Sequence, residues 1–174
     1  MKDTTVVSVG LFAAWVVHDI EELLTMRTTS RRVLQRSPRW VPLPPELERS
    51  GISQAQVNLT VALMAPVVAA ASWRGAVTEC RSPFFRGAVL GFGFHGLAHL
   101  AGSFVAQGYT TGLLTTPTVV LPFWRKAHTL LRRKNLLNDA PILTTTIALC
   151  GLPLLGGVHV IAWRILGDRV LGEK

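Results

Sequence analysis

Charged residues are scarce in this chain of 174 residues: Lys, Arg, Asp and Glu together make up 16% of it, whereas apolar residues make up 49%. Soluble globular domains carry about 25% charged residues, so the composition excludes an ordinary soluble globule. Cysteine is scarce as well, and the two that occur, Cys80 and Cys150, argue against a disulfide framework. The length fits one domain of the usual size. We therefore expect a single integral membrane domain over residues 1–174.

Motifs for nucleic-acid binding are absent, although the formal net charge is +8. The sequence has no aromatic RNA-binding motif, no zinc-finger spacing and no basic helix with heptads. The basic residues instead lie between apolar runs, at 27–49, 74–86, 125–134 and 164–174. Basic residues in such places anchor membrane spans at the phospholipid surface. We therefore expect membrane lipid as a partner and no nucleic acid.

A cleavage site for signal peptidase is also missing near the N-terminus. The opening stretch, MKDTTVVSVGLFAAWVV, has a weak basic start, but no small-residue cleavage motif follows it. We therefore expect the first apolar segment to be retained as a membrane span.

Five apolar segments are long enough, or nearly so, for the roughly 20 helical residues that cross a hydrocarbon core. We expect membrane spans at about 4–26, 56–73, 83–107, 110–124 and 142–166. The fourth segment is short and contains Pro117 and Pro122, as in a kinked span or a re-entrant segment. Since lipid does not tolerate open sheet edges, the predicted fold class is all-α, a polytopic transmembrane helix bundle.

Two arguments bear on the number of spans. Counting Lys and Arg on the loops favours four spans, with the fourth segment re-entrant. The depth of the intramembrane histidines, described below, favours five, and we adopt five. The basic segment 124–137, WRKAHTLLRRKNLL, is expected to form an amphipathic helix at the membrane surface after the fourth segment.

Ionisable residues occur within the predicted spans, where they are rare and are functional candidates by default. The first span contains VVHDIEELL, the third contains GFGFHGLAHLAG, and the last contains one histidine. The residues concerned are His18, Asp19, Glu21, Glu22, His95, His99 and His159.

Helical spacing predicts which of these side chains share a face. His18 and Glu22 are separated by four residues, Glu21 lies three residues after His18, and His95 and His99 are again four apart. Residues three or four apart are neighbours on a helix surface. Each of the two helices should therefore present one polar face to the bundle interior.

The expected depth of these residues in the membrane supports the same grouping. Because two crossings separate the first and third spans, these spans run parallel, and His18 should lie level with His95 and His99. In a five-span protein His159 reaches that level too, and this is our reason for preferring five. Asp19 lies about a quarter turn away from the polar face. We expect it to meet a lipid head group or an arginine.

Two or more histidines and a carboxylate at one level are a plausible ligand set for zinc or iron. We assign metal binding to His18, Glu22, His95 and His99, with water completing an open site. Glu21 is then the candidate general base or general acid. The alternative to a metal site is a structural role, in which these side chains only make hydrogen bonds between helices or an ion pair with an arginine.

The motif HDIEE also resembles the signature of the H-x-x-E-E family of small bacterial polytopic membrane proteins, whose function is unknown. The likeness extends to Gln56 and Asn58, to the segment around His95, and to GYTTGLL, which is similar to a Tyr-Thr-Pro-Gly turn of the family with Thr111 in place of proline. It covers residues 11–121. The resemblance implies a five-helix protein of the bacterial inner membrane in which His18, Glu21 and Glu22 are important. It implies no reaction.

The leading functional hypothesis is an integral membrane enzyme whose His/Glu centre, with metal, acts on a lipophilic prenyl, terpenoid or lipid substrate. Catalysis is assigned to His18, Glu21 and Glu22. A second enzyme hypothesis drops the metal: a protonated glutamic acid starts a terpene cyclisation or isomerisation, and aromatic side chains stabilise the cation. The residues assigned to substrate binding are Trp15, Asn58, Phe92, Phe94 and Tyr109.

A hypothesis from another class is a proton- or metal-coupled transporter subunit, in which the same residues relay protons or hold a metal in transit. Against it, the sequence shows no internal repeat of the kind that alternating access commonly uses. A homodimer would supply the missing symmetry.

Overall fold

The computed structural model describes residues 2–36 and 45–166. Their helices are α1 (Asp3–Gln35), α2 (Pro45–Ser50), α3 (Gln54–Val77), α4 (Pro83–Ala106), the π-helical turn η1 (Thr116–Val120), α5 (Leu121–Arg133) and α6 (Pro141–Leu166). The described residues contain no strand. The predicted all-α fold class is therefore confirmed.

Local sequence signals set the starts of the long helices. Ser53 precedes α3, and its side chain accepts a hydrogen bond from the backbone N–H of Gln56. Ser82 does the same for α4 with the N–H of Phe85, and a proline occupies the first turn. Both are N-caps of the preferred residue type, which satisfy backbone donors that have no partner inside the helix. α4 ends at Ala106, and the Gln107 that caps it has a φ of 49°, in the left-handed region.

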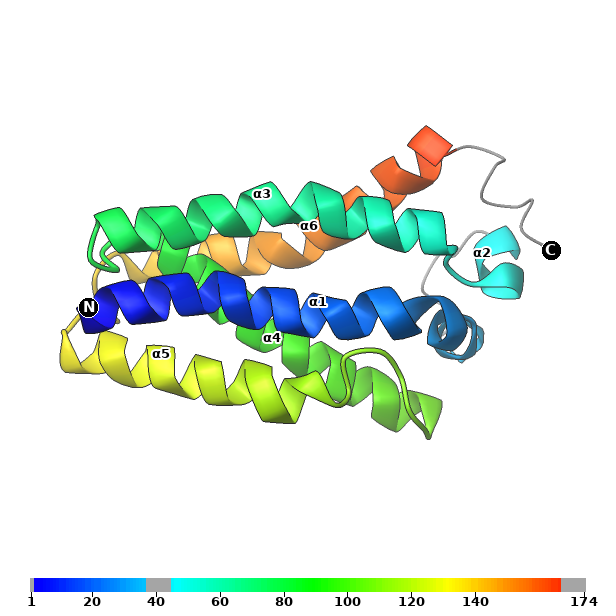
Figure 1. Ribbon diagram of the computed structural model, residues 1–174, viewed down its shortest axis with the longest axis horizontal. Helices are drawn as coiled ribbons and strands as arrows, with labels where there is room; N and C mark the ends of the chain where they lie inside the picture. Colours follow the sequence, from blue (N-terminus) through cyan, green and yellow to red (C-terminus); the bar gives the residue numbers. More distant parts are fainter. Residues whose placement is uncertain (1, 37–44, 167–174) are drawn as a thin grey trace.

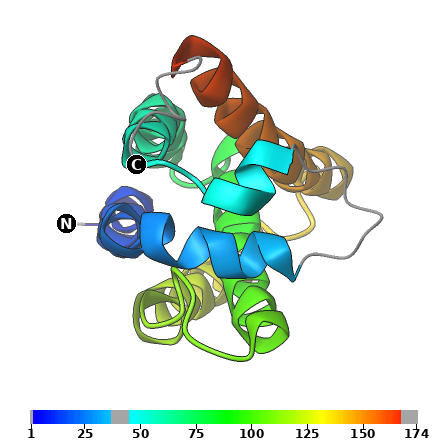
Figure 2. The ribbon, with the colours of Figure 1, turned by 90° about the vertical axis from the view of Figure 1, so that its right-hand side faces the viewer.

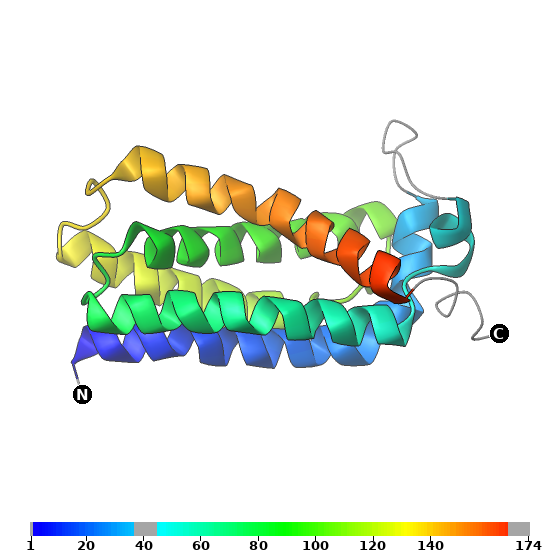
Figure 3. The same cartoon turned by 90° about the horizontal axis from the view of Figure 1, so that it is seen from above.

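The long helices lie side by side along one axis (Figure 1). α1, α4 and α6 run in one direction, whereas α3 and α5 run in the other. α1 packs most extensively against α3, and α4 packs most extensively against α6 (Figure 2). α6 crosses the bundle obliquely and approaches α3 toward its C-terminal end (Figure 3). The parallel direction expected of the first, third and last segments is therefore confirmed.

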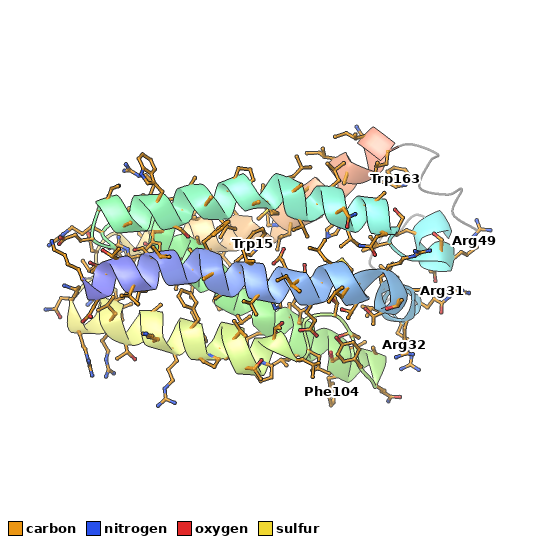
Figure 4. All side chains as sticks on the ribbon, in the orientation of Figure 1. Trp15, Arg31, Arg32, Arg49, Phe104 and Trp163 are labelled. Atoms are coloured by element: carbon orange, nitrogen blue, oxygen red, sulfur yellow. The ribbon has the colours of Figure 1, made fainter. Side chains whose placement is uncertain are left out.

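Three of the described helices, α3, α4 and α6, are long and apolar enough to cross a membrane. Large apolar side chains on the outside of the bundle fit a lipid environment, because burial in lipid removes their surface from water. Phe104 is 85% exposed and Ile142 is 83% exposed. Phe104 points away from the bundle in Figure 4. α1 has 33 residues but carries the acidic motif. The count of five spans stays a prediction.

The fourth segment differs from its predicted bounds. The helix begins at Thr116 and continues from η1 without a break into α5, as far as Arg133. The predicted surface helix is thus a continuation of the fourth segment, and residues before Thr116 form a turn. Pro117 is accommodated because it lies in the first turn of this helix, where a missing N–H costs little, and Pro122 lies where the π-helical turn passes into α5. On α5 the buried Ala127 and Leu131 face the bundle.

The start of α1 is packed against the turn between α3 and α4, where Cys80 is completely buried. The Cys80 thiol lies 3.5 Å from the Ser8 hydroxyl and 3.6 Å from the Thr4 carbonyl. Burial raises the pKa of the Cys80 thiol, although the Ser8 contact works in the opposite direction. Because the thiolate is the nucleophile, a raised pKa leaves less reactive sulfur at neutral pH.

We expect Cys80 in a Cys150→Ala chain to react with N-ethylmaleimide about a hundredfold more slowly in the folded protein than in denaturing detergent. The rate should rise with pH beyond the range in which a free thiol is already ionised. Intact-mass spectrometry over time gives both rates. Equal rates in the two conditions would contradict the packing of α1 against this turn.

Candidate metal centre

The acidic motif of α1 faces the interior of the bundle. His18 is completely buried, and Asp19, Glu21 and Glu22 are each less than a tenth exposed. The intervening Ile20 is exposed on the outer face. The expectation that Asp19 meets a head group or an arginine is therefore wrong: Asp19 lines an internal cavity together with Glu22.

Four side chains from α1 and α4 converge. The Oε1 atom of Glu22 lies 2.8 Å from His99 Nε2, 3.4 Å from His95 Nε2 and 3.8 Å from His18 Nε2. The Nε2 atoms of His95 and His99 are 2.9 Å apart. One ligand atom from each of the four residues can be chosen so that all lie within 4.8 Å of one another. Ligand atoms around a tetrahedral ion, with bonds of about 2.0–2.1 Å, are separated by roughly 3.3 Å. The observed separations bracket that value.

The tautomer of His18 follows from its neighbours. The Thr115 hydroxyl donates its proton to Glu21 Oε2, at 2.5 Å, so it can only accept from His18 Nδ1, 2.7 Å away. With the proton on Nδ1, the neutral ring carries a lone pair on Nε2. That Nε2 atom is buried and has no hydrogen-bond partner among the described residues. Its lone pair lies toward Glu22 Oε1, 3.8 Å away.

Glu22 Oε1 is a second buried acceptor atom in this cluster. It has no hydrogen bond of good geometry among the described residues, although the Nε2 atoms of His99 and His95 lie 2.8 Å and 3.4 Å away. Two acceptor atoms that face each other without a donor are costly in a buried site. A bound cation between them would relieve that cost.

Glu21 faces away from this cluster, toward the turn that follows α4. Its carboxylate accepts hydrogen bonds from the Tyr109 hydroxyl at 2.7 Å, from the backbone N–H of Leu114 at 3.2 Å and from that of Thr115 at 2.8 Å, in addition to the Thr115 hydroxyl. Both carboxylate oxygens are therefore occupied. Glu21 fixes the turn and, through Thr115, the orientation of His18. Such a group behind a histidine ligand sets its tautomer and ring orientation.

The turn also packs against His99. Gly112 has a φ of +76°, and a Cβ at this position would lie 2.5 Å from His99 Cγ. Two effects oppose a side chain at this position: the left-handed backbone conformation and a steric clash with the imidazole ring. Glycine at this position therefore lets the turn approach the ring closely.

Replacing Gly112 by alanine should lower the free energy of unfolding by about 1–3 kcal/mol, because φ and the His99 ring both oppose a Cβ. Gly102→Ala is the matched control, since nothing lies within 4 Å of a Cβ there. That control should leave stability unchanged or raise it slightly, as alanine favours helix. Thermal unfolding in detergent compares the two variants, and equal midpoints would contradict the close packing on His99.

A cavity of about 890 Å³ borders the cluster, between α1, α3, α4 and α6. Glu22, His95 and His99 lie on its wall. His159 reaches the cavity from α6, and its Nδ1 lies 3.3 Å from the Thr60 hydroxyl of α3. The sequence-based expectation that His159 reaches the level of the other histidines agrees with this placement.

The residues assigned to substrate binding are only partly gathered at this cavity. Trp15 and Phe92 line it. The other three, Asn58, Tyr109 and Phe94, are not among the lining residues. Asn58 is exposed and accepts a hydrogen bond from Gln54, and the Tyr109 hydroxyl donates one to Glu21. Phe94 is half-buried.

Comparison with known proteins places the chain in one family. The family model described as "Protein of unknown function with HXXEE motif" matches residues 9–125. The chain belongs to the HXXEE family. No curated protein and no solved structure matches the chain. Its HXXEE motif comprises His18, Glu21 and Glu22, so the motif supplies two residues of the cluster and the carboxylate that positions one of them.

Thr111 links the turn to α1 through two hydrogen bonds. The backbone N–H of Thr111 donates to the Thr29 hydroxyl at 3.3 Å, and the Thr111 hydroxyl accepts from Thr25 at 3.0 Å. Proline has no N–H and could not make the first of these bonds. The turn is therefore held against α1 at Thr111 by a contact that needs a residue with an N–H.

Proposed function

We propose that this HXXEE protein is an integral membrane metalloenzyme that acts on a lipophilic substrate. His18, Glu22, His95 and His99 would hold one divalent ion at the wall of the cavity. The observation that carries the proposal is the convergence of these ligand atoms, with buried lone pairs of His18 and Glu22 that no described residue satisfies.

The donor set favours zinc or iron. Three imidazole nitrogens and one carboxylate oxygen suit borderline metals, whereas magnesium and calcium prefer oxygen ligands throughout. The group also resembles a catalytic site more than a structural one, because it borders a cavity instead of being closed on all sides. A bound ion would act as a Lewis acid that polarises an oxygen of the substrate.

Proton transfer is best assigned to Asp19. The sequence alone favoured Glu21 as the general base or acid, but the Glu21 carboxylate is occupied by the turn and faces away from the cavity. Asp19 lies on the cavity wall beside Glu22. We therefore assign Glu21 a positioning role and Asp19 the transfer of a proton to or from the substrate.

The substrate class follows from the walls of the cavity and its surroundings. Most lining side chains are apolar, among them Met26, Val61, Met64 and Leu155. Pockets of this size and character bind small molecules. A bundle whose outer face carries exposed apolar side chains receives such a substrate from the surrounding lipid. We place the protein in the bacterial inner membrane, as the family resemblance implies.

A second candidate function needs no metal, and two aromatic residues favour it. Trp15 and Phe92 line the cavity together with Asp19 and Glu22. A protonated carboxylic acid of that wall would donate its proton to an alkene or epoxide, and the aromatic rings would stabilise the resulting cation. Such a protein would be a terpene cyclase or isomerase.

Elemental analysis decides between the two. The protein should be purified through a tag that does not bind metal, from cultures supplied with zinc and iron. We expect about one ion of zinc or iron per chain. Loading the stripped protein with Co²⁺ should give the visible absorption of a tetrahedral site. Protein without stoichiometric metal and without this absorption would overturn the metalloenzyme and leave the acid-initiated enzyme.

A further inference from the structure

The cavity is elongated along the helix axes. Its lining residues on α6 run from Thr146 to His159, and those on α4 run from Phe84 to His99. At about 1.5 Å per residue, each stretch is roughly 20 Å long. Because α4 and α6 run in the same direction (Figure 1), both stretches begin at one end of the cavity and finish at the other.

The acidic residues and histidines that line the cavity are gathered at one end, and the thiol Cys150 lies on α6 between the two ends. Asp19, Glu22, His95 and His99 lie at the polar end, and His159 faces them from α6, beside Thr60. The opposite end is apolar, with the lining residues Val68, Phe84, Ala88 and Ile147. α3 runs the other way and fits the same polarity, since its lining residues change from Thr60 at the polar end to Val68 at the apolar end.

At the apolar end, α4 and α6 approach each other closely. A Cβ on Gly87 would lie 2.6 Å from a methyl carbon of Ile147 and 3.0 Å from the Thr144 carbonyl oxygen. Further along, a Cβ on Gly91 would be 3.5 Å from the Ala148 carbonyl oxygen, which is an ordinary contact. The two helices therefore limit how far an apolar chain can extend beyond Phe84 and Gly87.

We propose that the cavity binds a lipid with one apolar chain and a terminal oxygen-bearing head, the head at the His/Glu end and the chain directed toward Phe84. The inference rests on the proposed function, whose site supplies the polar end. The imidazoles and carboxylates hydrogen-bond the oxygen of the head, and the apolar walls bury the chain. The close approach of α4 and α6 at this end makes Ala88 and its neighbours determinants of chain length.

Two photoreactive primary alcohols of equal length test the orientation. One carries a diazirine at the end of its chain, and the other carries it beside the hydroxyl group. After illumination, the first should label peptides around Phe84–Ala88 and Thr146–Ala148, and the second should label peptides around Thr60 and His159. Reversed or identical patterns, or labelling confined to outer residues such as Phe104, would overturn the proposal.

A variant at the apolar end tests chain length. In Ala88→Phe, the longest alcohol that competes with the probe should bind about tenfold more weakly, while a short alcohol competes as before, because filling a pocket excludes extra methylenes. Ala69→Phe is the control, since Ala69 is exposed on α3 and does not line the cavity. An unchanged chain-length profile in Ala88→Phe would overturn the inference.

The metal content of each preparation keeps the two proposals apart. Oriented labelling in protein that binds no metal would refute the metalloenzyme and support lipid binding. Stoichiometric metal without oriented labelling would support the metal site and refute this mode of lipid binding. Thermal unfolding of Ala88→Phe and Ala69→Phe verifies that both variants are folded before they are compared.

Discussion

Replacing His99 by alanine is expected to lower the metal content of the purified protein from about one ion per chain to less than a tenth of that. His99 Nε2 is the nitrogen closest to Glu22 Oε1, at 2.8 Å, and it lies 2.9 Å from His95 Nε2. Its removal leaves three ligands and a gap at the centre of the cluster. Elemental analysis of parent and variant, purified side by side, measures the loss.

His128→Ala is the control for this experiment. His128 is an exposed histidine on α5 and does not belong to the cluster, so its removal should leave the metal content unchanged. Restoring the ligand as His99→Cys should recover part of the binding, because a thiolate is also a zinc ligand. Equal metal content in His99→Ala and the parent would refute the assigned ligand set even if the protein binds metal elsewhere.

The convergence of the four side chains was predictable from the sequence. His18 and Glu22, like His95 and His99, are separated by one helical turn, and parallel helices bring two such pairs to one depth. The structure places their ligand atoms within 4.8 Å of one another. Their binding of metal remains a prediction. Helix identity was predictable for the same reason, since lipid leaves no other way to satisfy a spanning backbone.

The direction of Asp19 was not predictable, because its burial depends on how many neighbours surround α1. A helix with one partner buries a single stripe, and Asp19 lies off that stripe. α1, however, contacts α3, α4 and α5, so its buried face is wider. His18 then faces α4, where it meets His95 and His99, while Asp19 reaches the cavity that α3 and α6 enclose.

The role of Thr115 was also missed, and the sequence carries no signal that would have found it. Thr115 lies 97 residues after His18 in the chain, within a segment that contains several other threonines. It reaches His18 only because the chain turns back after α4 and the Glu21 carboxylate binds that turn. The resemblance to the family indicated the turn, but a contact over this distance requires the fold.

Thr115→Val is expected to weaken metal binding by about 10- to 100-fold without abolishing it, which is the usual effect of removing a group that orients a histidine ligand. Valine has nearly the shape of threonine but no hydroxyl group. It leaves His18 Nδ1 without its acceptor and removes the shortest hydrogen bond of Glu21. The ring of His18 can then rotate or change tautomer. Competition with a chelator of known affinity measures the change.

Two further variants separate positioning from mere stability. Thr115→Ser keeps the hydroxyl and should restore metal affinity to within a few-fold of the parent, whereas a purely structural role for the methyl group predicts no rescue. Thr118→Val removes the hydroxyl of a threonine in η1 that donates to the Leu114 carbonyl and makes no contact with the cluster among the described residues, so it should leave affinity unchanged. If Thr115→Val, Thr115→Ser and Thr118→Val bind metal equally well, the chain from Glu21 through Thr115 to His18 does not control the site. Failure of Thr115→Ser alone to recover affinity would instead assign the effect to packing of the turn.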